Sequence, residues 1–335
     1  PIAPVWGVTV PDEDPARIAD AARAGVQLIR LRVDWATIEP APGAFEVAAW
    51  DALASAARAA GVGLVAVVDS APAWARRDPP WPAAWWVCDE PAALASPPSA
   101  PPTDAADLAR FAARFAERYR DVLVALEVWR EPNVLPHWRR TGPDPEDYAA
   151  LLWAVTAAVR PVAPGVRIVS APLAPTTDVG VCYLSDVVYL DRLARTGALA
   201  AVDAVGAVAA GFGQPPDAPA GDREVLNAAR VELLRRVVAR FDVDRPLWIV
   251  ADPGPTADGA ARDDRAWWQA LRRRTDAAWP FAAAVFAGDA PPSPAAGGTW
   301  ADRLVPAAGG PPAASLPTAR PTVEASMRPP HPGSA

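Results

Sequence analysis

The chain has 335 residues, of which 51% are hydrophobic and 21% are charged, and its formal net charge is −7. An acidic chain without basic runs lacks the clustered positive charge that binds a phosphate backbone, so nucleic acid is excluded as a partner. No stretch reaches the roughly 18 uncharged apolar residues that a membrane-spanning helix needs, so no membrane span is expected.

Short apolar runs rich in β-branched residues alternate along the chain with longer Ala-rich segments of helical period. This alternation is typical of repeated βα units around a parallel sheet. The expected strands are residues 5–10, 27–33, 63–68, 123–129, 166–170, 202–208, 246–250 and 281–286. The expected helices are residues 15–24, 47–60, 105–119, 145–159, 183–196, 222–241 and 262–277.

Two of these helix starts carry a capping acid directly before a first-turn proline, at Asp14 and Asp144. Eight strands with a helix in every gap predict an α/β fold, the (β/α)8 TIM barrel, as one domain over residues 1–288. Residues 78–103 are rich in Pro and Trp and form a long insertion after the third strand. That insertion is expected on the active-site side of the barrel.

Residues 289–335 are dominated by Pro, Ala and Gly with little periodicity. This composition predicts an extended or wrapping tail without a regular eighth helix, and the tail is a candidate contact for a protein assembly partner. The chain begins at Pro1 rather than Met, which indicates that an upstream segment, such as a secretory signal, was removed or is not included. A location outside the cytoplasm is the resulting expectation.

Cys88 and Cys182 lie far apart in the sequence and match no metal-ligand spacing. Two interpretations are open for them: a pair of buried free thiols, or a disulfide. The sequence contains no metal-ligand cluster, no Gly-rich phosphate loop and no Ser/His/Asp arrangement, so neither a metal nor another cofactor is expected.

The segment L-E-V-W-R-E-P-N at residues 126–133 resembles the W-N-E-P-N motif of the retaining barrel glycosidases, a clan that includes cellulases, mannanases and β-xylosidases. The resemblance implies that Glu131 is the general acid/base, with Trp129 and Asn133 as matching neighbours. Such a residue needs a raised pKa, because it must protonate the departing glycosidic oxygen.

Three other segments extend the resemblance to about residue 288. Residues 29–43 are similar to the second-strand signature of the β-xylosidase-like branch, in which an Arg supports the nucleophile, and Arg30 matches that Arg. Residues 70–75, S-A-P-A-W-A, resemble the third-strand end and contribute Trp74. Residues 247–256 fall where the seventh strand of this branch reads W-I-T-E-F-G-W-P-T.

The sequence departs from the family at several site positions. A match without gaps places Ala251 on the nucleophilic Glu, and Asp252, one residue later, is expected to point away from the cavity. Arg130 replaces the Asn that holds the sugar 2-hydroxyl, and Val-Ala-Ala at 208–210 replaces His-Pro-Tyr. Arg130 is expected to reach into the sugar space and to contact an acidic side chain there.

Two functions follow from this comparison. The first is a glycoside-hydrolase-like barrel that is catalytically inactive and has a carbohydrate-binding or structural role; here Glu131 is paired with an Arg, which lowers its pKa. The alternative is an active O-glycosyl hydrolase of β-linked glycans that uses Glu131 with a second carboxylate. The candidates for that carboxylate are Asp252, Glu127 and Asp34. The candidate substrate-binding residues are Arg30, Trp74, Trp129, Arg130, Asn133 and Trp138, whereas His137 is interpreted as a hydrogen-bonding loop residue.

Overall fold

Parallel strands alternate with helices along the whole described chain. The computed structural model describes residues 4–11, 13–76, 100–135, 137–138, 142–254 and 265–288. The strands are β1 (Val5–Val10), β2 (Leu28–Asp34), β3 (Gly63–Asp69), β4 (Leu123–Val128), β5 (Arg167–Ser170), β6 (Val205–Ala210), β7 (Leu247–Asp252) and β8 (Ala282–Ala287). The helices are α1 (Pro15–Arg23), α2 (Trp35–Ile38), α3 (Ala48–Ala60), α5 (Ala105–Tyr119), α6 (Pro145–Val162), α7 (Asp186–Arg195), α8 (Val231–Ala239) and α9 (Arg265–Ala278), with 3₁₀ turns η2 (Ala198–Ala200) and η3 (Ala228–Arg230).

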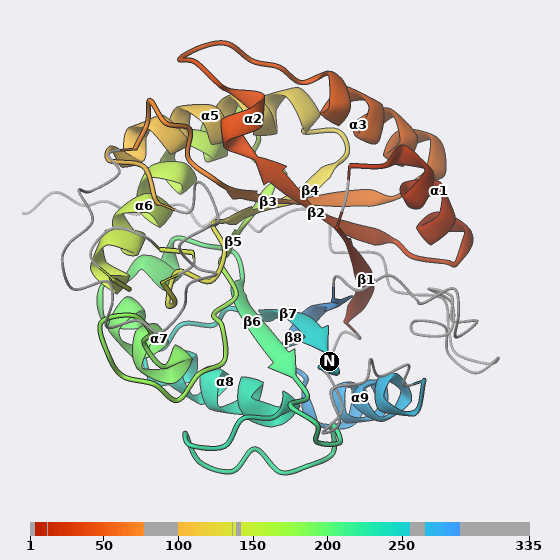
Figure 1. Cartoon of the computed structure of the whole chain (residues 1–335). Helices are drawn as coiled ribbons and strands as arrows, with labels where there is room; N and C mark the ends of the chain where they lie inside the picture. Colours follow the sequence, from red (N-terminus) through yellow and green to blue (C-terminus); the bar gives the residue numbers. More distant parts are fainter. Residues whose placement is uncertain are drawn as a thin grey trace, which may run out of the picture.

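The strands form one eight-stranded sheet in the order β5-β4-β3-β2-β1-β8-β7-β6, so β5 and β6 are its two ends. An isolated parallel bridge between Val169 and Ala204 brings these ends together. Two backbone hydrogen bonds support it, from Ser170 N to the Ala204 carbonyl (3.1 Å) and from Asp203 N to the Ile168 carbonyl (2.7 Å). The sheet therefore closes into a (β/α)8 barrel with the helices around it, which confirms the predicted fold class (Figure 1).

Aspartate caps define where several helices begin. The Asp14 side chain accepts from Ala16 N, and the Asp144 side chain accepts from the backbone N–H groups of Glu146 and Asp147, each directly before a first-turn proline. The Asp104 side chain caps α5 by accepting from Ala106 N, there without a first-turn proline. These caps satisfy N–H groups that have no partner within the helix, and they place α1 and α6 at the predicted starts.

The side chains of each strand divide between two buried layers. One cluster fills the barrel interior: Val5, Leu28, Val65, Ala125, Val169, Ala204, Trp248, Ala284 and Phe286. A larger cluster lies between the strands and the helices and includes Leu31, Leu126, Ile249 and Ala251. Because side chains alternate along a strand, these clusters identify which strand-end residues face the barrel mouth.

Some predicted helix limits are wrong. Helix α7 begins at Asp186 rather than at residue 183, because Tyr183 and Leu184 form antiparallel bridges with Val134 and Val179. Helix α8 begins at Val231 rather than at residue 222, because the preceding residues form a loop and the turn η3.

Cys182 takes part in a disulfide bond, so the free-thiol interpretation is wrong for this residue. Cys88 lies outside the described residues, as do residues 77–99 of the insertion and the tail at 289–335. The predicted tail conformation and the domain boundary at 288 therefore stay predictions. None of the helices in the described segments is long and apolar enough to cross a membrane.

Candidate functional site

The backbone is strained where β3 and β4 end. Ser70, Trp129 and Glu131 have φ values of 64°, 71° and 41°, which lie in the left-handed region that non-glycine residues rarely adopt. Each such residue costs about 1–3 kcal/mol, and such strain clusters at functional sites. These positions lie at the C-terminal end of the barrel strands, which is the active-site end in barrel enzymes.

Glu131 is paired with a histidine. His137 Nε2 lies 2.9 Å from Glu131 Oε2, and Arg130 Nη2 lies 3.1 Å from His137 Nδ1. Because Arg130 can only donate, Nδ1 accepts and Nε2 carries the proton that it donates to Glu131. Burial raises the pKa of Glu131, but the hydrogen bond from His137 and the charges of Arg130 and Arg30 outweigh it and hold that pKa below its usual range.

A second carboxylate lies on β4 below Glu131. Glu127 is buried, and its two oxygens accept from Arg30 Nε (3.0 Å) and Arg30 Nη2 (2.6 Å). The predicted position of Arg30 inside the barrel is consistent with this contact, in which Glu127 on β4 accepts from two nitrogens of Arg30. Bidentate hydrogen bonds between a guanidinium and a carboxylate are strong and fix the geometry of the pair, so they hold Glu127 in this position.

Arg130 contacts an acidic side chain, as the sequence predicted. Its Nε lies 3.8 Å from Asp69 Oδ2, and its side chain is 38% exposed. Asp69, at the end of β3, also accepts from Arg32 Nε (2.8 Å) and from Ser70 Oγ (2.9 Å). The ends of β2, β3 and β4 are thus joined by a network of alternating charges.

On β7 the prediction that Ala251 faces the barrel mouth and Asp252 points away from it is wrong. Ala251 is fully buried in the layer between strands and helices, whereas Trp248 belongs to the barrel interior. Alternation places Asp252 on the same face as Trp248, and a Cβ built on Gly288 would lie 3.4 Å from Asp252 Cβ. Asp252 is exposed and faces the barrel mouth; Ala251 does not occupy that position.

Asn133 is a structural residue rather than a surface for a ligand. It is fully buried, its amide donates to the carbonyls of Ala174 (2.8 Å) and Leu184 (3.0 Å), and its Oδ1 accepts from Ala174 N (2.8 Å). Asn133 therefore ties the loop after β4 to the loop after β5.

The predicted tryptophans are mainly packed. Trp129 and Trp138 are each 1% exposed and meet edge to face at 6.0 Å, and Trp129 Nε1 donates to the His137 carbonyl (2.7 Å). Trp74 is partly buried, packs against Trp35 and donates to the Glu39 carbonyl (2.9 Å). Only Trp74 of these three keeps a partly exposed surface.

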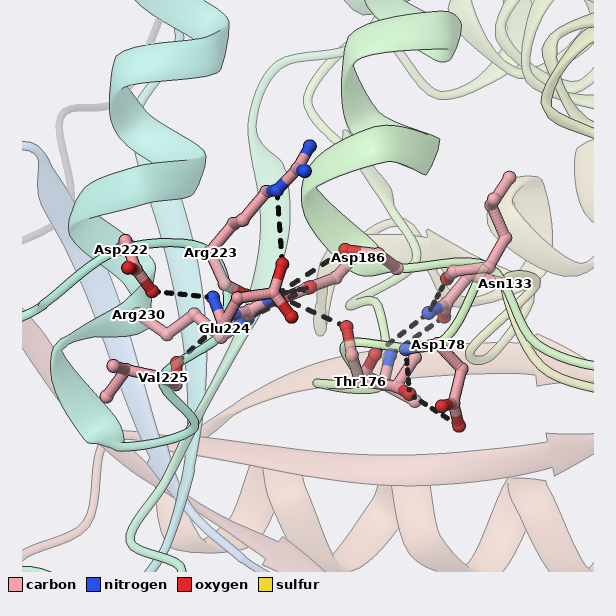
Figure 2. Close-up of polar contacts among 12 residues, drawn as sticks. Asn133, Thr176, Asp178, Asp186, Asp222, Arg223, Glu224, Val225 and Arg230 are labelled. Atoms are coloured by element: carbon pink, nitrogen blue, oxygen red, sulfur yellow. Dashed lines mark hydrogen bonds and ion pairs between the residues drawn. The ribbon is translucent and has the colours of Figure 1, made fainter. Parts of the chain in front are cut away.

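Figure 2 shows a polar cluster that sequence reasoning missed. Arg230, after β6, and Asp186, at the start of α7, form a buried ion pair of 2.7 Å. Arg230 also donates to the carbonyls of Arg223 (2.7 Å), Val225 (2.9 Å) and Thr176 (3.2 Å). This cluster joins the loops after β5 and β6. A lone Arg in an apparent helix gives no sequence signal of such a role.

Other site residues could have been found by counting along strands. Arg32 follows Arg30 by two residues, so alternation places both on one face, and Asp69 ends the adjacent strand. Among the residues that the structure describes, no group of three or more His, Cys, Asp or Glu could hold a metal ion.

No family model and no curated protein matches the sequence. Solved structures with the same fold include a glucosidase from Croceicoccus marinus, at 16% identity and a TM-score of 0.58 over 86% of this chain and 60% of that one. An endoxylanase from Clostridium papyrosolvens matches at 12% identity and a TM-score of 0.53 over 87% of this chain and 66% of that one. An endo-β-1,4-glucanase from Xanthomonas axonopodis pv. citri matches at 12% identity and a TM-score of 0.53, over 85% and 87%.

The chain therefore has the (β/α)8 fold of these glycoside hydrolases. It spans less than two thirds of the length of the glucosidase and of the endoxylanase. Likeness at this level of identity concerns the fold, so a function has to be argued from the site itself.

Proposed function

We propose that the barrel mouth binds a β-linked carbohydrate without hydrolysing it. The observation that carries this proposal is the contact between His137 Nε2 and Glu131 Oε2 (2.9 Å). A general acid must be protonated at the working pH, whereas this contact and the nearby charges hold the pKa of Glu131 below its usual range. An ionised Glu131 has no proton to give to a leaving glycosidic oxygen.

Two further features argue against hydrolysis. The buried Arg30, which by resemblance would support a nucleophile on β7, donates two hydrogen bonds to Glu127 on β4. Arg130 stands where the related glycosidases have the Asn that holds the sugar 2-hydroxyl, and it contacts Asp69 and His137. Both differences remove interactions that would strengthen in a glycosidase transition state.

Asp252 favours a second candidate, an active O-glycosyl hydrolase that pairs Glu131 with Asp252. Its carboxylate faces the barrel mouth on β7. The separation of the two carboxyl groups would decide the stereochemical outcome of this candidate, since about 5–5.5 Å is typical of retaining enzymes and about 6.5–9.5 Å of inverting ones.

We also propose that the protein acts outside the cytoplasm. The disulfide bond at Cys182 supports this location, because disulfides persist mainly in oxidising compartments.

Two measurements on the whole chain test the function. Calorimetric titration with cellohexaose and xylohexaose should give binding, and a panel of aryl β-glycosides should give no turnover above background. Wild-type turnover that disappears in both Glu131→Gln and Asp252→Asn would establish the hydrolase instead. Absence of both binding and turnover would reject both candidates.

A further inference from the structure

A tight turn with an unexpected residue follows β6. The Gln214 N–H donates to the Gly211 carbonyl (2.9 Å), and the two central residues, Phe212 and Gly213, have φ values of 48° and 76°. Two central residues with positive φ are the mark of a type I′ turn, which favours Asn-Gly because Asn and Gly tolerate that backbone. A phenylalanine in the first central position is strained and is not explained by the turn.

The turn is fixed beside the end of β7. Gly211 N donates to the Asp252 carbonyl (2.8 Å), and Trp267 Nε1 donates to the Gln214 carbonyl (3.2 Å). A Cβ built on Gly254 would lie 3.6 Å from Phe212 N. Phe212 therefore occupies a defined position on the rim of the mouth, next to the strand end that carries Asp252.

Core packing does not explain Phe212 either, because the residue is 45% exposed. Four of the five described non-glycine residues with positive φ are Ser70, Trp129, Glu131 and Phe212, which lie at the ends of β3, β4 and β6 around one mouth. Phe212 thus departs from the preference of this turn for Asn or Gly, and it is an exposed aromatic residue on the active-site side of the barrel. Such departures from local sequence preference are expected at functional residues.

We propose that Phe212 is the aromatic platform on which the apolar face of a pyranose ring of the bound glycan stacks. This assignment rests on the proposed carbohydrate-binding function and names the rim above β6 and β7 as one of its sugar subsites. An aromatic ring offers a large flat apolar surface, which suits the C–H face of a β-linked pyranose. The hydrogen-bonded turn fixes the backbone of Phe212 before the sugar arrives, which lowers the entropy lost on binding.

The test is Phe212→Asn, a substitution that the turn itself should prefer. We expect affinity for cellohexaose or xylohexaose, whichever binds wild type, to fall about tenfold, which corresponds to roughly 1.4 kcal/mol. The thermal midpoint should stay the same or rise by about 2 °C, because the strain at this position is relieved. Trp153→Gln is the matched control, since Trp153 is also 45% exposed but lies on α6, and it should leave affinity unchanged.

Each other outcome rejects the assignment in a recognisable way. Wild-type binding that survives Phe212→Asn unchanged would reject the platform and leave the proposed function standing. A lower thermal midpoint in Phe212→Asn would show that the ring is needed for packing. Wild type that binds neither oligosaccharide would reject the proposed function and the platform together.

Discussion

Replacing Arg230 by methionine should lower the free energy of unfolding by about 3–5 kcal/mol, the usual cost of removing one partner of a buried ion pair. The Arg230 and Asp186 side chains are 0% and 1% exposed. Methionine fills much of the same volume but donates no hydrogen bond, so Asp186 remains as a buried charge. The carbonyls of Thr176, Arg223 and Val225 also lose their donor. Since domains are typically stable by about 5–15 kcal/mol, this loss is a large fraction of the total.

Urea unfolding followed by far-UV circular dichroism measures this loss. The control is Arg58→Met, because Arg58 pairs with Asp121 at the surface, where the two side chains are 44% and 54% exposed. An exposed pair contributes at most about 1 kcal/mol, so the control should be nearly neutral. An Arg230→Met variant that loses no more than Arg58→Met would refute the reasoning.

The pH dependence and a second substitution identify the cause. Burial raises the pKa of Asp186, and Arg230 opposes that rise, so Arg230→Met should raise it further. A folded pKa above the unfolded value means that the penalty on stability is absent below the unfolded pKa, grows as pH rises from there, and is complete above the folded pKa. The defect of Arg230→Met should therefore shrink between pH 7 and pH 4, and adding Asp186→Asn should recover part of it at pH 7. A defect that does not depend on pH would contradict the role of the buried charge.

Three further predictions concern the mouth and its surroundings. The pKa of Glu131 is lowered in the folded state, so its ionised form stabilises the protein above the unfolded pKa of about 4.3. This stabilisation is lost as pH falls through the folded-state pKa. The difference in unfolding free energy between wild type and Glu131→Gln should thus shrink below about pH 4; growth on acidification would contradict it. Asn133→Ala should cost about 1–3 kcal/mol in urea unfolding, because the carbonyls of Ala174 and Leu184 lose their donor, and a neutral result would show that water replaces the amide. Ala251→Glu should destabilise the protein and give no turnover of aryl β-glycosides, because it buries a charge in the helix-facing layer; turnover would show that position 251 faces the mouth.

The strands could be predicted closely because each is a short apolar run between turn or helix signals. β1 has the predicted limits, and the starts of β3 and β4 also agree. Helix α5 agrees at both ends, since its apolar positions recur at helical spacing after the Asp104 cap. Local sequence pattern is sufficient where local interactions decide the structure.

The sequence could not predict which side chains of β7 point into the barrel. In a parallel barrel a strand is buried on both faces, so it has no polar side to mark the exterior. The segment L-W-I-V-A-D is apolar up to its last residue, and only the packing of Trp248 in the barrel interior identifies the face that Asp252 shares. The match without gaps to the glycosidase motif placed Ala251, rather than Asp252, at the position of the nucleophile.

The remaining differences between the predicted and the observed structure arise from contacts between residues that are not at regular sequence spacing. The start of α8 is delayed because Asn227 donates to the Pro219 carbonyl (2.8 Å) and Arg230 pairs with Asp186, forty-four positions away. The pairing of Glu131 with His137 depends on the path of the loop after β4. Neither contact has a fixed sequence spacing from which it could be derived.

The closure of the barrel gives the Arg230 and Asp186 pair a second importance. The ladder is shortest between β5 and β6, where Val169 and Ala204 form an isolated bridge, and the pair spans that same joint from the loops above it. If the ring opened there, two strand edges would offer unpaired N–H and carbonyl groups to neighbouring molecules, which is the usual start of edge-to-edge aggregation. Because the buried pair holds together the loops on the two sides of this joint, we expect it to oppose self-association as well as unfolding.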